Sequence, residues 1–183
     1  MAVETPGLEM DFQAPDFVLP ATDGKKYSLQ DLKGSNGTVI MFICNHCPYV
    51  KSATGRIVRD MEALLPLGVS AVAINSNDAV AYPEDSFGKM IEFSDTNNFS
   101  FPYLHDSSQD IARAFGAGCT PDYFGFNSEL KLQYRGRLDT NRRIEEEPNA
   151  RRDLFEAMSL IAKTGKGPDK QFPSMGCSIK WKE

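Results

Sequence analysis

The sequence predicts a single α/β domain with a central mixed β-sheet flanked by helices, and three observations lead to it. Residues 38–43 and 69–74 are continuous apolar runs, the pattern of strands buried on both faces. Residues 49–65 between them are predicted to form a helix that ends at a proline and a glycine, so residues 38–74 form one βαβ unit. A Cys-x-x-Cys motif lies at the strand-to-helix turn of that unit.

Length and composition fit one domain. The chain has 183 residues, of which 41% are hydrophobic and 25% charged, and this is enough to bury a core without disulfide bonds. We expect a domain over residues 1–166 with a C-terminal tail, residues 167–183, packed on it. The net charge of −5 argues against a nucleic-acid partner. Lys131, Arg135 and Arg137 are expected on a solvated strand face, and residues 142–147, together with Arg151 and Arg152, in a mixed-charge loop.

The N-terminal segment bears on location. It is polar and acidic and lacks the basic start and apolar stretch of a secretory signal. Elsewhere the sequence does not approach the ~20 apolar residues of a membrane span, so we expect no membrane partner and a cytoplasmic location. Thiols are normally kept reduced there, so the four cysteines indicate chemistry rather than a structural framework.

The other elements follow along the chain. Residues 17–20 and 27–29 flank a turn at Asp23-Gly24 and predict an N-terminal β-hairpin. The next segment is an insertion between the second core strand and Thr120-Pro121. It comprises a loop, a helix, a short strand and a short helix, at residues 75–83, 85–97, 102–105 and 111–115. An antiparallel hairpin is expected next, formed by residues 123–127 and 131–137. An amphipathic helix at residues 152–163 closes the domain.

The C-terminal tail carries an alternating pattern. Cys177, Ile179 and Trp181 alternate with polar residues, which predicts an ordered strand with one apolar face that Cys177 shares with Trp181. Cys119 and Cys177 are each open to two interpretations. One is a buried free thiol that acts as a small hydrophobe. The other is that the tail folds back, so that Cys177 forms a disulfide with Cys119 or relays oxidation from Cys44.

Cys44 and Cys47 carry the strongest chemical signal. Two residues between cysteines at a helix start place the sulfurs within disulfide reach. The helix N-terminus favours negative charge, so Cys44 is expected to be the exposed nucleophile with a lowered pKa. Cys47, one turn inside the helix, is expected to be the buried resolving thiol. His46 between them either stabilises the thiolate or is a solvated residue at a helix start.

Structural zinc is the competing explanation for the cysteine pair. A zinc ribbon needs a second Cys-x-x-Cys or a Cys/His pair, and the sequence contains neither. The Gly116-Ala117-Gly118 stretch lacks the strand-before, helix-after context of a dinucleotide site. We therefore expect no resident metal and no cofactor.

The ordered motifs resemble those of a known family. The chain resembles thioredoxin-like proteins of the peroxiredoxin-like, AhpC/TSA-related (redoxin-domain) group, and is close to TlpA/ResA-type oxidoreductases. The resemblance rests on Pro15-Asp16-Phe17, Tyr27-Ser28-Leu29, Cys44-Asn45-His46-Cys47-Pro48, Thr120-Pro121, Tyr134-Arg135-Gly136 and the ending Gly176-Cys177-Ser178. It implies a thioredoxin fold, with Pro121 as the cis-proline facing the cysteines. Thr120 would then bind an extended thiol substrate through its main chain.

The sequence departs from the family patterns at specific positions. Ile43 stands where thioredoxins have tryptophan, and Thr38 stands where they have a buried acid. When Cys47 is aligned with the peroxidatic cysteine of peroxiredoxins, Cys44 replaces their Thr/Ser and Ile40 their proline. The groups that orient a peroxide are thus missing.

Three functions compete. The first is a thiol–disulfide oxidoreductase acting on protein or small-molecule thiols and disulfides. The second is a peroxiredoxin-like thiol peroxidase that takes a hydroperoxide, with Cys47 or Cys44 as the peroxidatic residue. The third is a Cu(I) carrier that uses Cys44 and Cys47, with His46 or His105 as nitrogen ligand. A monomer and a homodimer fit the sequence equally.

Overall fold

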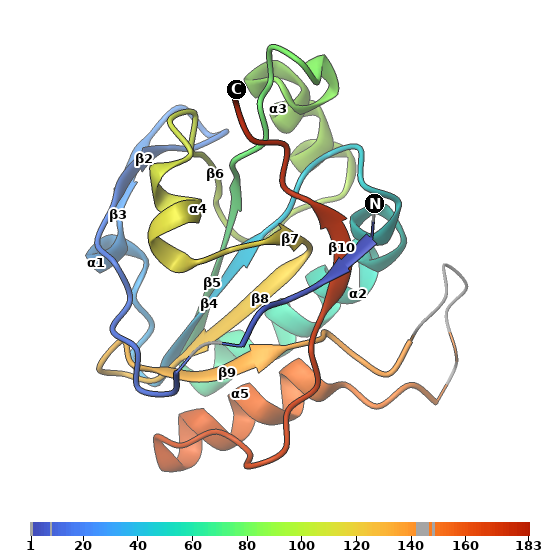
Figure 1. The fold of residues 1–183 in the computed structure, drawn as a ribbon. Coiled ribbons are helices and arrows are strands. Elements are labelled where there is room, and N and C mark those ends of the chain that lie inside the picture. Colours follow the sequence, from blue (N-terminus) through green and yellow to red (C-terminus); the bar gives the residue numbers. More distant parts are fainter. Residues whose placement is uncertain (1, 8, 142–146, 148) are drawn as a thin grey trace.

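A five-stranded mixed sheet forms the centre of the molecule (Figure 1). The computed structural model describes residues 2–7, 9–141, 147 and 149–183. The strands lie in the order β6-β5-β4-β8-β9, with β4, β5 and β6 parallel and β8 and β9 antiparallel to their neighbours. Their bounds are β4 Gly37–Phe42, β5 Val69–Asn75, β6 Tyr103–His105, β8 Asp122–Phe126 and β9 Leu132–Gly136. The predicted α/β class and mixed sheet are confirmed.

Helices cover both faces of this sheet. Because side chains alternate along a strand, β4 sends Val39 and Met41 to one core and Ile40 and Phe42 to the other. The first core is closed by α2 (Pro48–Leu64), α3 (Phe87–Thr96) and α5 (Asp153–Thr164). The second is closed by α1 (Leu29–Leu32), α4 (Asp110–Phe115) and the N-terminal hairpin. Every residue of β4 is buried, as its unbroken apolar run predicts.

The remaining elements agree with the sequence. The predicted hairpin forms between β2 (Val18–Pro20) and β3 (Lys26–Ser28). The predicted insertion after β5 contains α3, β6, α4 and the short 3-10 turn η2 (Pro83–Asp85), while η1 (Leu65–Leu67) ends α2. Among the described residues, no helix has both the length and the apolar character that crossing a membrane requires.

A second, three-stranded sheet brings the two ends of the chain together. β10 (Met175–Ser178) pairs on one side with β1 (Ala2–Glu4) and on the other with β7 (Cys119–Thr120) (Figure 1). The tail is thus an ordered strand. Its predicted apolar face is only partly right: Ile179 is buried and Cys177 half-buried, but Trp181 is 36% exposed. The reason is that β10 ends at Ser178, and Trp181 lies beside Arg113, whose guanidinium carbon is 4.3 Å from the ring centroid.

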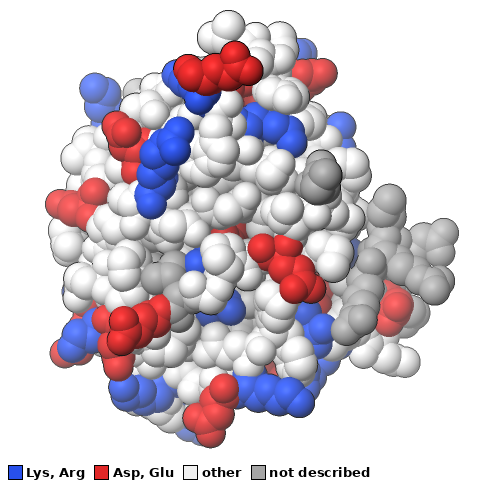
Figure 2. Space-filling model, in the orientation of Figure 1, with Lys and Arg blue, Asp and Glu red and all other residues white. Residues whose placement is uncertain are grey.

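The predicted solvated face of β9 is wrong. The Arg135 side chain is 3% exposed and pairs with Asp122 at 2.8 Å, while Arg137 pairs with Asp153. These arginines neutralise carboxylates that the fold buries, so the arginine side chains turn away from solvent toward those carboxylates. Most of the mixed-charge loop predicted at residues 142–147 lies outside the described residues. On the face drawn in Figure 2, positive and negative side chains are interspersed.

Candidate functional site

The connection from β4 to α2 places both cysteines of the motif beneath the surface. Helix α2 begins at Pro48, so its N-cap residue is Cys47 and Cys44 lies before the helix. Both residues are 0% exposed. The expectation that Cys44 is exposed is therefore wrong, because the tail and the segment before β8 cover the motif. Both cysteines belong to the core cluster that includes α2 and α5.

Cys47 has the environment of a thiolate. The thiol of Cys44 interacts with its sulfur, and this interaction does most to lower the pKa of Cys47. The backbone N–H of Val50, in the first turn of α2, and the backbone and thiol of Cys177 act in the same direction. Together they outweigh burial and lower the Cys47 pKa to about 4. Unpaired N–H groups at a helix start stabilise an anion in this way.

Cys44 has the opposite environment. Its interaction with Cys47, its burial and the negative charge of Asp85 all raise the Cys44 pKa. The hydroxyl of Thr120, 3.3 Å from the Cys44 sulfur, lowers it by less. The two pKa directions are thus the reverse of those expected from the sequence. The main physical reason is the interaction between the two sulfurs. The helix boundary adds to it: because α2 starts after Cys47, the backbone N–H of Val50 acts on Cys47.

Thr120 and Pro121 face the cysteines as the family resemblance implies. The Thr120–Pro121 peptide bond is cis. The carbonyl oxygen of Thr120 lies 3.2 Å from the Cys47 sulfur, which donates a hydrogen bond when it carries its proton. The main chain of Thr120, however, is not free for a substrate. It belongs to β7, and β10 places Cys177 directly opposite Thr120.

Asp85 is a site residue that the sequence does not indicate. It lies in η2, is 0% exposed, and one carboxylate oxygen accepts a hydrogen bond from the backbone N–H of Asn45 at 2.7 Å. The other oxygen accepts from Asn77 Nδ2 at 2.7 Å and lies 2.7 Å from His46 Nδ1. The His46 ring stacks on Tyr82 with 5.6 Å between centroids. A buried acid thus exists beside the motif, supplied by the insertion rather than by position 38.

One group of potential metal ligands occurs in the described part of the chain. Cys44, His46 and Asp85 each offer one ligand atom, and these atoms lie within 4.8 Å of one another. The Asp85 oxygens already accept hydrogen bonds, and a carboxylate is a hard ligand that Cu(I) does not prefer. His105 instead stacks on Phe87, with 5.8 Å between ring centroids. The arrangement therefore does not favour a copper carrier.

The two remaining cysteines lie on opposite faces of the strand pair β7–β10. Cys177 is opposite Thr120, and Cys119 is opposite Ser178. Since neighbouring residues of a strand point to opposite faces, a Cys119–Cys177 disulfide does not fit this register. Burial raises the pKa of Cys119, whose thiol donates to the Pro121 carbonyl. Cys119 thus behaves as a buried small hydrophobe, whereas Cys177 lies against the redox pair.

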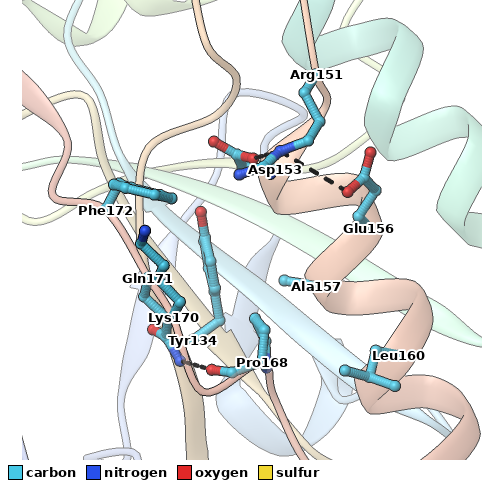
Figure 3. A pocket seen from close by; sticks show the side chains of 10 residues that line it. All are labelled: Tyr134, Arg151, Asp153, Glu156, Ala157, Leu160, Pro168, Lys170, Gln171 and Phe172. Atoms are coloured by element: carbon cyan, nitrogen blue, oxygen red, sulfur yellow. Dashed lines mark hydrogen bonds and ion pairs between the residues drawn. The ribbon is translucent and has the colours of Figure 1, made fainter.

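A cleft of about 980 Å³ opens beside the cysteines. The first turn of α2 (Pro48, Tyr49), Pro121, and Met175 of β10 form its wall nearest the motif. Its lining also includes Arg56, which pairs with Asp139, and Tyr123, whose buried hydroxyl has no partner among the described residues. A smaller cavity of about 230 Å³ lies along α5, between Tyr134, Arg151 and Phe172 (Figure 3). Neither cavity is lined by a cysteine.

Comparisons with known proteins bear on the family and the fold. A family model described as "AhpC/TSA family" matches residues 10–135. The crystal structure of an uncharacterized conserved protein from Geobacillus kaustophilus is 45% identical, has a TM-score of 0.94, and is matched over 100% of this chain and 97% of that one. The thioredoxin domain of a thiol-disulfide oxidoreductase from Bacteroides vulgatus is 14% identical, with a TM-score of 0.60 over 70% of this chain and 89% of that one, and shows the fold alone.

A curated relative points to a chemistry. The thiol-disulfide oxidoreductase ResA from Bacillus subtilis (strain 168) is 27% identical over 119 residues, or 65% of this chain. The match spans 62% of the length of ResA.

Proposed function

Since this chain belongs to the AhpC/TSA family and has the thioredoxin fold, we propose that it is a thiol–disulfide oxidoreductase whose redox couple is Cys44 and Cys47. One observation carries the proposal: the two sulfurs interact with each other at the start of α2 and face cis-Pro121. Two thiols so placed can close into a disulfide and reopen. The relative from Bacillus subtilis is named a thiol-disulfide oxidoreductase, and this supports the same chemistry.

We assign the nucleophile to Cys47. The Cys47 thiolate attacks one sulfur of a partner disulfide, a mixed disulfide forms, and the partner's other sulfur leaves as a thiolate. Cys44 then loses its proton and attacks the Cys47 sulfur, which releases the second partner thiolate and leaves a Cys44–Cys47 disulfide. The partner gains two electrons and the chain loses two. The lowered pKa of Cys47 and the raised pKa of Cys44 support this order, because only a thiolate attacks a disulfide.

His46 and Asp85 serve the second step. Cys44 must lose a proton before it attacks, and a ligand atom of His46 and one of Asp85 lie within 4.8 Å of its sulfur. Asp85 fixes the imidazole through Nδ1, as carboxylates do for catalytic histidines. His46 is 25% exposed at its side chain, so it can pass the proton to solvent. We propose that His46 is the base for Cys44 and that Asp85 positions it.

Trapping the mixed disulfide tests the assignment. Each reduced variant is mixed with an excess of a small aromatic disulfide, and the adducts are mapped by mass spectrometry. Cys44→Ser combined with Cys177→Ser should accumulate a mixed disulfide on Cys47, because neither thiol beside Cys47 then remains to resolve it. Cys47→Ser should react slowly, and Cys119→Ala, the matched control, should form the intramolecular disulfide as the wild type does. Rapid trapping on Cys44 in Cys47→Ser would reverse the two roles.

A thiol peroxidase is the second candidate, because the Cys44 thiol and the start of α2 lower the Cys47 pKa to about 4. Its thiolate would attack a hydroperoxide oxygen to give a sulfenic acid and an alcohol or water, and Cys44 would then displace water to form the disulfide. The absence of a Thr/Ser at position 44 opposes it. Rapid oxidation by hydrogen peroxide that Cys47→Ser abolishes would support the peroxidase. An oxidation rate near that of a free thiol would exclude the peroxidase.

A further inference from the structure

The redox pair has no direct contact with solvent. Cys44 and Cys47 are 0% exposed, and Cys177 is the one cysteine of the four that is only half-buried. All four lie within the described residues. A partner sulfur must approach in line with the disulfide it attacks, so access limits exchange. The buried pair therefore needs either an opening of the structure or an internal route to the surface.

The C-terminal strand occupies the position that the fold offers to an extended substrate. β10 pairs with β7, so its backbone takes the edge next to cis-Pro121. Gly176 makes this approach close: a Cβ there would overlap the carbonyl of Thr120. Ser174 Oγ also donates to the Pro121 carbonyl at 2.9 Å. These contacts fix the position of the tail and place Cys177 directly opposite Thr120.

Cys177 contacts the redox pair. Both the backbone and the thiol of Cys177 interact with the Cys47 sulfur, and Cys177 packs against the core cluster that contains Cys44 and Cys47. Cys47 is thus flanked by two thiols, Cys44 on the core side and Cys177 on the solvent side. A sulfur with two thiol neighbours can exchange one disulfide partner for the other.

The tail is fixed rather than loosely laid down. β1 pairs with the outer edge of β10, and beyond the strand Lys180 N–H donates to Asn77 Oδ1 at 2.9 Å. Lys182 N–H donates to Gln109 Oε1 at 2.8 Å. Displacing such a segment for every turnover would break many hydrogen bonds. Relay through the tail needs only exchange between neighbouring sulfurs.

We propose that Cys177 is a third redox thiol, which takes over the disulfide of the buried pair and presents it at the surface as Cys47–Cys177. The proposal rests on the proposed function of Cys44 and Cys47. In the step, Cys177 loses its proton, and the resulting thiolate attacks the Cys47 sulfur of the Cys44–Cys47 disulfide. The Cys44–Cys47 bond breaks, Cys44 leaves as a thiolate and takes up a proton, and the electron count of the protein does not change.

The exchanged disulfide is then reduced from outside by a protein dithiol. Its first thiolate attacks the half-buried Cys177 sulfur, releases the Cys47 thiolate, and its second thiol resolves the mixed disulfide. The cleft fits this encounter. Met175 lines the cleft and stands two residues before Cys177, so both side chains lie on one face of β10. A partner segment in the cleft would therefore reach Cys177 without displacing the tail.

Disulfide mapping is the first test. Wild type, Cys44→Ser and Cys119→Ala are oxidised with a small disulfide, quenched in acid and mapped after alkylation. We expect wild type and Cys119→Ala to contain Cys44–Cys47 in exchange with Cys47–Cys177, and Cys44→Ser to convert fully to Cys47–Cys177. A Cys177 that stays a free thiol in all three proteins would overturn the relay.

Reduction kinetics is the second test. Oxidised wild type and Cys177→Ser are each reduced by thioredoxin and, separately, by dithiothreitol. Loss of the relay should slow reduction by the protein dithiol about tenfold or more. Reduction by dithiothreitol should slow much less, because a small dithiol reaches a buried disulfide more easily than a protein does. Equal rates with thioredoxin would overturn the relay even where Cys47–Cys177 can form. A wild type without any Cys44–Cys47 disulfide would instead overturn the proposed function.

Discussion

At the scale of single residues, the two sulfurs of the motif divide their roles through contact with each other. This contact does most to raise the pKa of Cys44 and to lower that of Cys47. The buried carboxylate of Asp85 adds to the first shift and the start of α2 adds to the second. The motif has one cysteine at each end, and the spacing alone does not distinguish them. Asp85 and the start of α2 give the two cysteines different environments. Groups whose environments separate their pKa values can be assigned different roles in one reaction.

The first prediction concerns this acid. Asp85→Asn weakens the hold on His46, so the attack of Cys44 on the mixed disulfide should slow by about tenfold or more, as for loss of a general base. The substitution also removes a charge that raises the Cys44 pKa, so a slower step in spite of an easier thiolate would assign the effect to the positioning of His46. Rapid-quench measurement of mixed-disulfide decay isolates that step. The exposed neighbour Glu84→Gln is the matched control. Decay at the wild-type rate in Asp85→Asn would exclude a role for the acid in resolution.

The second prediction concerns pH. In the reduced protein the folded pKa of Cys47, about 4, lies below its ordinary value of 9.0. Between these values the unfolded state binds more protons than the folded state, so stability should rise with pH from about 4 to about 9. Urea unfolding of the reduced protein across this range measures the slope. Cys47→Ser should flatten it, and an unchanged slope in that variant would assign the pH dependence to other groups.

Most residues of the site are predictable from the sequence, but the separate roles of its two cysteines are not. Cys44 and Cys47 are found by their spacing at a strand-to-helix turn, which is a local pattern, and Thr120 and Pro121 by the resemblance to the family. The order of the two cysteine pKa values is not predictable, since it depends on the contact between the two sulfurs and on where α2 begins. Asp85 is also missed, because its contact with Asn45 spans 40 residues and no periodicity connects them.

At the scale of elements, β10 depends on one glycine. Gly176 passes so close to the Thr120 carbonyl that no Cβ fits between them. The third prediction is that Gly176→Ala forces β10 away from β7 and costs about 1–3 kcal/mol of stability, the usual penalty of overpacking. Alkylation of Cys177 should become faster in the same variant. Chemical denaturation and timed alkylation measure the two effects.

A second glycine supplies the control for that substitution. Gly55 is exposed on α2, and a Cβ there would meet nothing within 4 Å. Gly55→Ala should therefore stabilise the protein by about 0.5–1 kcal/mol through helix propensity. Equal effects of the two substitutions would mean that β10 yields easily and is not seated as tightly as Gly176 indicates.

Elements were predicted best where the pattern is local. The buried strands β4 and β5 follow from unbroken apolar runs, and the β2–β3 hairpin from its turn residues. β1 was not predicted, because its three residues have no pattern of their own and become a strand only by pairing with β10. The alternation of the tail predicts β10 but runs past its end, since a pattern cannot show where pairing partners stop.

At the scale of the whole molecule, both ends of the chain meet above the redox site. β1 and β10 come from opposite termini and lie side by side (Figure 1). Thr5 N–H donates to the Ser174 carbonyl at 3.0 Å, and Ser174 N–H donates back to Thr5 Oγ1 at 3.1 Å. The order of the N-terminal segment is thus coupled to the position of the strand that carries Cys177.

The last prediction follows from this coupling. Deleting residues 1–5 removes the outer partner of β10 but leaves its pairing with β7, so the fold should survive with a loss of about 1–3 kcal/mol. For a chain of this size each kcal/mol lowers Tm by about 2–4 °C. The equilibrium between the Cys44–Cys47 dithiol and disulfide should change little, because β1 pairs with β10 on the side away from β7. Alkylation of Cys177 should accelerate, since β10 then becomes an edge strand that frays. A lower Tm with unchanged alkylation of Cys177 would mean that β1 stabilises the fold without holding the tail over the site.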